Sequence, residues 1–243
     1  VGVNRLGIGV VLPFIGKEFH TSQFQLALLI TGTSVTWAIS SWGSGWLSDR
    51  YGRKKILIPG AIAAVGFTAA MGAAWSWLSL FIIRDLIGIG DGVGWPSGQS
   101  TLAEEVPAER RALASGIFTA GYPFLGSVVG SIVIAALIKA LGWRSVFPIL
   151  SIVFLGVIIA LWVVMREPKR NSVPDRLDWR NAVSMMRNRY VIFLMLIQAG
   201  ALGWLQVGVL FNTQWLLTAR HTGIVTAGAI LSVSAAVGVV GTL

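Results

Sequence analysis

Residues 45–55 read GWLSDRYGRKK and separate two long apolar stretches. The stretches 21–48 and 56–83 contain no Lys, Arg, Asp, Glu or His. Each is longer than the roughly 20 residues that an α-helix needs to cross the hydrocarbon core of a bilayer. The charged residues between them are therefore predicted to form a short turn at a membrane surface, between two spanning helices.

Long uncharged stretches recur along the whole chain, which is 55% hydrophobic and only 12% charged. Soluble domains carry about 25% charged residues. The pattern predicts an all-α polytopic membrane protein with spans at 1–16, 24–48, 56–76, 78–102, 112–138, 144–165, 191–217 and 222–243. The first span begins without an initiator Met and the last ends without a flank, so we expect a piece of a longer protein.

Basic residues are distributed unequally between the predicted loops. The loops after the second, fourth and sixth spans hold most of the 19 Lys and Arg residues, whereas the opposite loops hold Lys17, Lys139, Arg144 and Arg220. Because cytoplasmic loops carry the excess of Lys and Arg, the even-numbered loops are predicted to be cytoplasmic, in a plasma (bacterial inner) membrane. The net charge of +9 is thus a topology signal, and no contiguous basic face indicates a nucleic-acid partner.

The pattern G-x-L-S-D-R-x-G-R-K of the quoted stretch resembles the signature loop of the major facilitator superfamily of secondary transporters. The resemblance implies a fold of two six-helix bundles, each made of inverted three-helix repeats, in a protein that we expect to be a monomer. This chain would supply the first bundle and about two helices of the second. Residues 1–165 form the N-terminal bundle, 166–190 a cytoplasmic linker and 191–243 the start of the C-terminal bundle.

In that family the signature loop is a cytoplasmic latch that holds the two halves together. The resemblance implies that Asp49 faces a helix N-terminus of the other half, where the helix dipole favours an anion. It also implies that Arg53 pairs with Glu104 or Glu105. The alternative is a tight turn with cationic membrane anchors. The predicted latch consists of Gly45, Asp49, Arg50, Gly52, Arg53 and Glu104.

Charged residues inside the predicted spans indicate a functional site, because a buried arginine costs about 2.5–3.5 kcal/mol on insertion scales. Arg84, Gly88 and Asp91 are spaced i, i+4, i+7 and share one helix face. Removal from water favours a protonated carboxyl, which suits a proton carrier at Asp91. The alternatives are an Arg84 neutralised by Asp85 that snorkels outwards, and an Asp91 that makes a structural hydrogen bond.

Arg84 is followed seven residues later by the acid Asp91. This pattern resembles that of span 4 in the anion:cation symporters, which move organic carboxylates with protons. That branch also carries an acid–arginine pair in span 1, where this chain has Asn4 and Arg5. The resemblance implies that Arg5 and Arg84 bind a small organic anion and that Asp91 carries the coupling proton. Further candidates for contact with the substrate are Trp37, Tyr122 and Gln198, each of which has packing between helices as its alternative.

The sequence is also compatible with other function classes. Two arginines also suit an organophosphate antiporter, and the same fold occurs in proton-driven drug exporters and in transport-inactive membrane sensors. The Gly-Pro motif of drug exporters is interrupted in Gly121-Tyr122-Pro123. We expect no enzyme, no metal and no cofactor, with the proton gradient as the energy source. Residues 84–96, RDLIGIGDGVGWP, lack the spacing of a dinucleotide fingerprint, and Pro96 is expected to bend the span.

Overall fold

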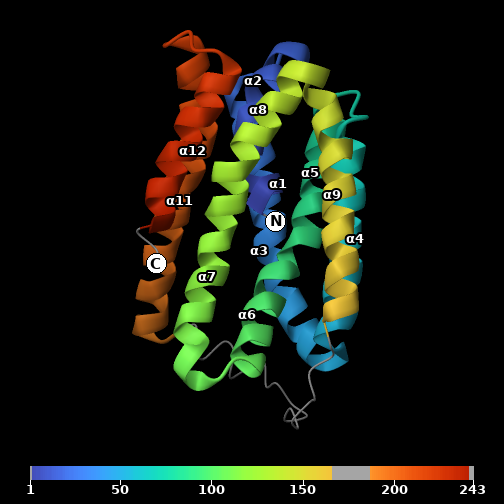
Figure 1. Cartoon of the computed structure of the whole chain (residues 1–243), viewed down its shortest axis with the longest axis vertical. Coiled ribbons are helices and arrows are strands. Elements are labelled where there is room, and N and C mark those ends of the chain that lie inside the picture. The colour runs from blue at the N-terminus through green and yellow to red at the C-terminus, as the bar shows by residue number, and fades with distance from the viewer. Residues whose placement is uncertain (1, 166–186, 241–243) are drawn as a thin grey trace.

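The computed structural model describes residues 2–165 and 187–240, in which every regular element is a helix (Figure 1). Most of the predicted linker lies outside the described residues. The helices are α1 (Gly2–Leu6), α2 (Ile8–Glu18), α3 (Gln23–Tyr51), α4 (Arg53–Met71), α5 (Trp77–Gly92), α6 (Gly94–Glu105), η1 (Ala108–Arg110), α7 (Arg111–Pro123), the π-helical η2 (Phe124–Val129), α8 (Gly130–Leu141), α9 (Trp143–Val164), α11 (Arg189–Thr218) and α12 (Ile224–Val240).

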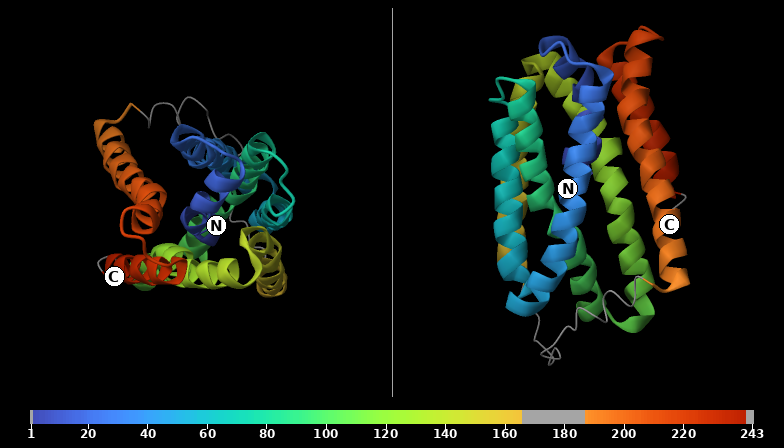
Figure 2. Two further views of the ribbon diagram at one scale, coloured as in Figure 1. Left: turned by 90° about the horizontal axis from the view of Figure 1, so that it is seen from above. Right: turned by 180° about the vertical axis from the view of Figure 1, so that it is seen from behind.

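The long helices run side by side along the long axis of the molecule (Figure 1). Helix α5 packs between α3 and α4, α9 packs on α4, and α12 packs on α8 and η2 (Figure 2). The core contains apolar residues such as Val11, Leu29 and Val146, whereas Ile152 and Val164 are exposed on α9. Apolar side chains on the outer surface suit a lipid solvent, in which the helix satisfies its own backbone polar groups.

Four helical stretches of the described residues are long and apolar enough to cross a bilayer by length and composition. They are Gln23–Ser48, Arg53–Met71, Ala108–Leu141 and Trp143–Val164. The prediction of an all-helical membrane fold is confirmed. The spans predicted at 1–16 and 78–102 each consist of two helices in the structure, because α2 follows α1 after Gly7 and α6 follows α5 after Val93.

The turn predicted between the spans 24–48 and 56–76 is present, but it is shorter than those bounds imply. Helix α3 continues to Tyr51 and α4 begins at Arg53, so Gly52 alone connects them, with φ 105°. Glycine adopts this positive φ without the steric cost that other residues pay. The Nζ of Lys54 donates to the carbonyl oxygens of Trp162 (2.5 Å) and Met165 (2.8 Å), and thereby binds the C-terminal end of α9.

The break between α5 and α6 has a specific chemical basis. Pro96 has no backbone N–H, so the carbonyl of Gly92, four residues earlier, lacks its helical donor. The hydroxyl groups of Ser41 (2.9 Å) and Ser44 (3.4 Å) on α3 donate to this carbonyl instead. The break between the two helices thus falls at Val93, three residues before Pro96, and serines of the neighbouring span bind the carbonyl that Pro96 leaves without a donor.

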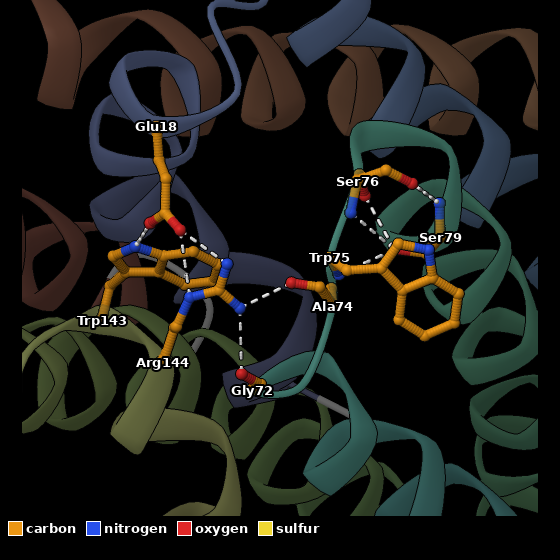
Figure 3. A network of polar contacts seen from close by, with 8 residues as sticks. All are labelled: Glu18, Gly72, Ala74, Trp75, Ser76, Ser79, Trp143 and Arg144. Atoms are coloured by element: carbon orange, nitrogen blue, oxygen red, sulfur yellow. Dashed lines mark hydrogen bonds and ion pairs between the residues drawn. The ribbon is translucent and has the colours of Figure 1, made fainter.

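A network of polar contacts joins three helix ends (Figure 3). The Nη2 of Arg144 donates to Oε1 of Glu18 at 2.6 Å, and the indole N–H of Trp143 donates to Oε2 at 2.6 Å. The Nη1 of Arg144 donates to the carbonyl oxygens of Gly72 (3.1 Å) and Ala74 (2.6 Å). This network connects the end of α2, the α4–α5 connection and the start of α9.

The network makes the stability of the fold depend on pH. Hydrogen bonds from Arg144 hold the pKa of Glu18 below its ordinary value of 4.5, with a further contribution from Trp143. A group with a lowered folded-state pKa stabilises the fold above its unfolded pKa, and this stabilisation is lost as the pH falls through the folded value. The effect is small, because the Glu18 and Arg144 side chains are 40% and 37% exposed.

We therefore expect Glu18→Gln to lower the melting temperature of the detergent-solubilised protein at neutral pH by at most a few degrees. The difference between the variant and the wild type should disappear well below pH 4.5, where both residues are neutral. Thermal melts at neutral and acid pH measure this difference, with the exposed Glu109→Gln as the control. A difference that persists unchanged in acid would exclude the charge of Glu18 as its cause.

Candidate functional site

The charged face predicted for span 4 lies inside the helix bundle. Arg84 is 2% exposed and Asp91 is 6% exposed, both on α5. Between them, Gly88 allows α3 to approach closely, since a Cβ there would lie 2.6 Å from the carbonyl oxygen of Thr33. The Nη1 of Arg84 donates to the carbonyl oxygen of Asn4 at 3.0 Å. Arg84 therefore reaches towards span 1 and does not snorkel to the outer surface.

Arg5 is held against α3 by two contacts. Its Nη2 donates to Oγ of Ser34 at 3.0 Å, and its guanidinium lies 4.5 Å from the ring centroid of Trp37. A cation over an indole face is attracted by the ring quadrupole, more strongly where water is excluded. Helix α1, which carries Arg5, lies at mid-height of the bundle in both side views (Figures 1 and 2). Helix α1 thus places Arg5 in the middle part of the bundle.

Two buried donors at this place have no hydrogen-bond acceptor among the described residues. They are Nε1 of Trp37 and Nε of Arg84. A buried unsatisfied donor costs about 1–3 kcal/mol, so a ligand that supplies an acceptor there gains that amount. Because both atoms are donors, a ligand that satisfies them presents an acceptor such as an oxygen atom.

Asn4 precedes Arg5 in the chain, and its side chain is held by α4. Its Nδ2 donates to Oγ1 of Thr68 at 3.0 Å, and the Thr68 hydroxyl donates to the carbonyl of Ala64 at 2.7 Å. The backbone carbonyl of Asn4 accepts from Arg84. The side-chain amide is therefore a neutral contact with α4 at the position where the symporter pattern has an acid.

The charged groups act on one another across the helices. Arg84 interacts electrostatically with Arg5, Asp91 and Asp85. Tyr122 on α7 lies within the electrostatic reach of both Arg5 and Asp91. The structure therefore brings Arg5, Trp37, Arg84, Asp91 and Tyr122, which the sequence places on four different spans, into one region.

Other predicted site residues lie elsewhere. Gln198 is exposed on α11. Among the latch residues, Arg50 is exposed at the end of α3, with its guanidinium 5.5 Å from the ring centroids of both Trp46 and Tyr51. The side chains of Asp49 and Glu104 lie outside the described residues. The substrate role of Gln198 and the latch roles of Gly45, Asp49, Arg50, Gly52, Arg53 and Glu104 stay predictions.

The sequence interpretation missed three contributors to the site. Ser34 precedes Trp37 by three residues on α3, so both reach the same arginine, and this spacing was a usable signal. Thr68 and Trp95 carry no such signal, because their contacts with Asn4 and Tyr122 join distant parts of the chain. An amphipathic pattern within one span does not reveal a partner in another.

The chain is similar to bacterial proteins that are named for the transport of organic anions. It is 31% identical over 231 residues to a probable 4-methylmuconolactone transporter of Cupriavidus pinatubonensis, covering 91% of this chain and 52% of that protein. It is 31% identical to the probable sulfoacetate transporter SauU of Cupriavidus necator (72% of this chain, 39% of that protein). It is 28% identical to the 4-hydroxybenzoate transporter PcaK of Pseudomonas putida (70% and 38%). The chain thus spans about half or less of the length of these relatives.

The fold is shared with a solved transporter structure. A bacterial homolog of the human lysosomal transporter Spinster, in an inward-facing, unoccupied conformation, superposes with a TM-score of 0.80 at 21% identity. The match covers 98% of this chain and 57% of that one. The sequence profile described as Major Facilitator Superfamily matches residues 1–243. Together with the helical architecture and the signature stretch at the α3–α4 corner, this match establishes that the chain belongs to the Major Facilitator Superfamily.

Proposed function

We propose that the full-length protein is a secondary transporter that takes up a small organic carboxylate together with a proton by alternating access. The observation that carries the proposal is the grouping of Arg5 on Trp37 with the buried Arg84 and Asp91. The names of the relatives support an organic anion as the substrate. The contacts of span 1 with spans 2 and 4 at one site suit a mechanism in which two bundles rock about that site.

Each charged residue has a distinct part in this mechanism. Arg5 binds the carboxylate, and Nε1 of Trp37 donates a second hydrogen bond to it. Arg84 holds the Asn4 carbonyl and contributes its positive charge and its free Nε to the same anion. Asp91 takes and releases the coupling proton.

The number of charges explains why the proton and the anion move together. With Arg5, Arg84, Asp85 and Asp91 all ionised, the empty site is neutral. Binding of the anion alone or the proton alone leaves one uncompensated charge, whereas binding of both restores neutrality. Enclosing an uncompensated charge away from water is costly, so the empty and the doubly loaded site close most readily.

Uptake into liposomes containing the purified full-length protein tests the proposal. An acid outer solution should drive accumulation of at least one member of a panel of carboxylates, and a protonophore should abolish it. Exchange that ignores the pH gradient would instead identify an anion antiporter. Export of the substrate in exchange for entering protons would identify a drug exporter, and binding without flux would identify a sensor. Each of these results contradicts symport.

A further inference from the structure

Three aromatic side chains form a cluster next to the charged site. The ring centroid of Trp95, in the first turn of α6, lies 5.2 Å from that of Phe118 and 5.8 Å from that of Tyr122. The Trp95 and Tyr122 rings are nearly perpendicular, at 85°, and the Trp95 and Phe118 rings are tilted at 51°. Phe118 and Tyr122 lie four residues apart on α7 and so share one face. The cluster is therefore a wall made by two helices.

This wall adjoins the charged residues on two sides. Trp95 follows Asp91 by four residues across the break at Val93, whose backbone keeps helical angles (φ −70°, ψ −31°). Tyr122 lies against α1, because a Cβ at Gly2 would come within 2.6 Å of its carbonyl oxygen. Gly2 is one turn before Arg5. The aromatic wall is thus carried by elements next to those of Arg5 and Asp91, and both charged residues act electrostatically on Tyr122.

The position of the wall separates it from the aromatic residues of the lipid surface. Trp42 and Trp162 are 61% and 58% exposed, whereas Trp95, Phe118 and Tyr122 are all partly buried between α6 and α7. Gly98 creates the space for this arrangement, since a Cβ there would lie 2.5 Å from Cζ of Phe118. The three rings are thus partly shielded and keep accessible surface.

We propose that Trp95, Phe118 and Tyr122 form the subsite for the body of the substrate and select planar unsaturated carboxylates over saturated ones. This inference rests on the proposed function, in which Arg5 binds the carboxylate. A flat π-system packs edge-to-face or offset against such rings and gains from their quadrupoles. A saturated ring is thicker and has no π-face, so it gains only from burial of its surface.

Benzoate and cyclohexanecarboxylate test the selectivity, because they share the carboxylate and the six-membered ring. We expect the wild-type protein in liposomes to take up benzoate with a KM about threefold to tenfold lower. Trp95→Ala should remove this preference by raising the KM for benzoate more than that for cyclohexanecarboxylate, and Trp95→Phe should retain part of it. Trp75→Ala, which changes a side chain that is 81% exposed outside the site, is the matched control.

Three results would overturn the inference, and they differ from a failure of the proposed function. An equal rise of KM for both acids in Trp95→Ala would reduce the cluster to packing between α6 and α7. An unchanged preference in that variant would place the rings outside the substrate site, as would a wild type that transports both acids with equal KM. If a folded wild type transports no carboxylate at all, the proposed function fails as well.

Discussion

Arg5→Gln is expected to reduce pH-driven carboxylate uptake by about 100-fold or more, because it removes the only partly accessible cation among the described residues of the site. The glutamine can still bond Ser34, but it cannot balance a carboxylate or stack as a cation on Trp37. Arg5→Lys keeps the charge and loses the planar fork, so it should be intermediate. Initial rates in liposomes at several substrate concentrations measure both variants.

Arg220→Gln is the matched control for this prediction. Arg220 also stacks on a tryptophan, with its guanidinium 4.9 Å from the ring centroid of Trp215, but it is exposed beyond the end of α11. Its replacement should leave uptake unchanged. Wild-type rates for Arg5→Gln, or an equal loss in both arginine variants, would remove Arg5 from the substrate site.

The class of fold was predictable from the sequence, because uncharged stretches of more than 20 residues indicate helices that are surrounded by lipid. The helix breaks were not predictable in detail. Pro96 predicts an interruption of the helix, but the serines that donate to the carbonyl of Gly92 lie about 50 residues away in α3. The α3–α4 corner shows the same limit. Most of the charged segment 45–55 belongs to the two helices, which are joined by Gly52 alone.

The candidate site was predictable only along single helices. The spacing of Arg84 and Asp91 placed both on one face, and the structure puts both in the interior. The pairing of Arg5 with Trp37 and the link from Asn4 to Thr68 depend on how spans 1, 2 and 3 pack. Such contacts arise from tertiary packing, so no periodicity within one span could give them.

Asp91→Asn should separate transport from its energy source. Asparagine resembles a protonated aspartate in shape and neutrality, so the variant is fixed in the proton-loaded state and no longer releases a proton. It should retain exchange of labelled for unlabelled substrate across the membrane but lose accumulation. The wild type, moving one proton with one monovalent anion, should accumulate about tenfold for each pH unit of gradient, whereas Asp91→Asn should only equilibrate.

Asp85→Asn distinguishes the proton carrier from a residue that merely balances charge. Asp85 also acts on Arg84 but is less buried than Asp91. Its replacement adds one positive charge to every state of the site, which should slow closure while uptake still responds to the pH gradient. If Asp91→Asn accumulates substrate against its gradient, or if Asp85→Asn alone abolishes the response to pH, the proton is carried elsewhere. Accumulation without Asp91 would leave this carboxyl a structural partner of the buried Arg84.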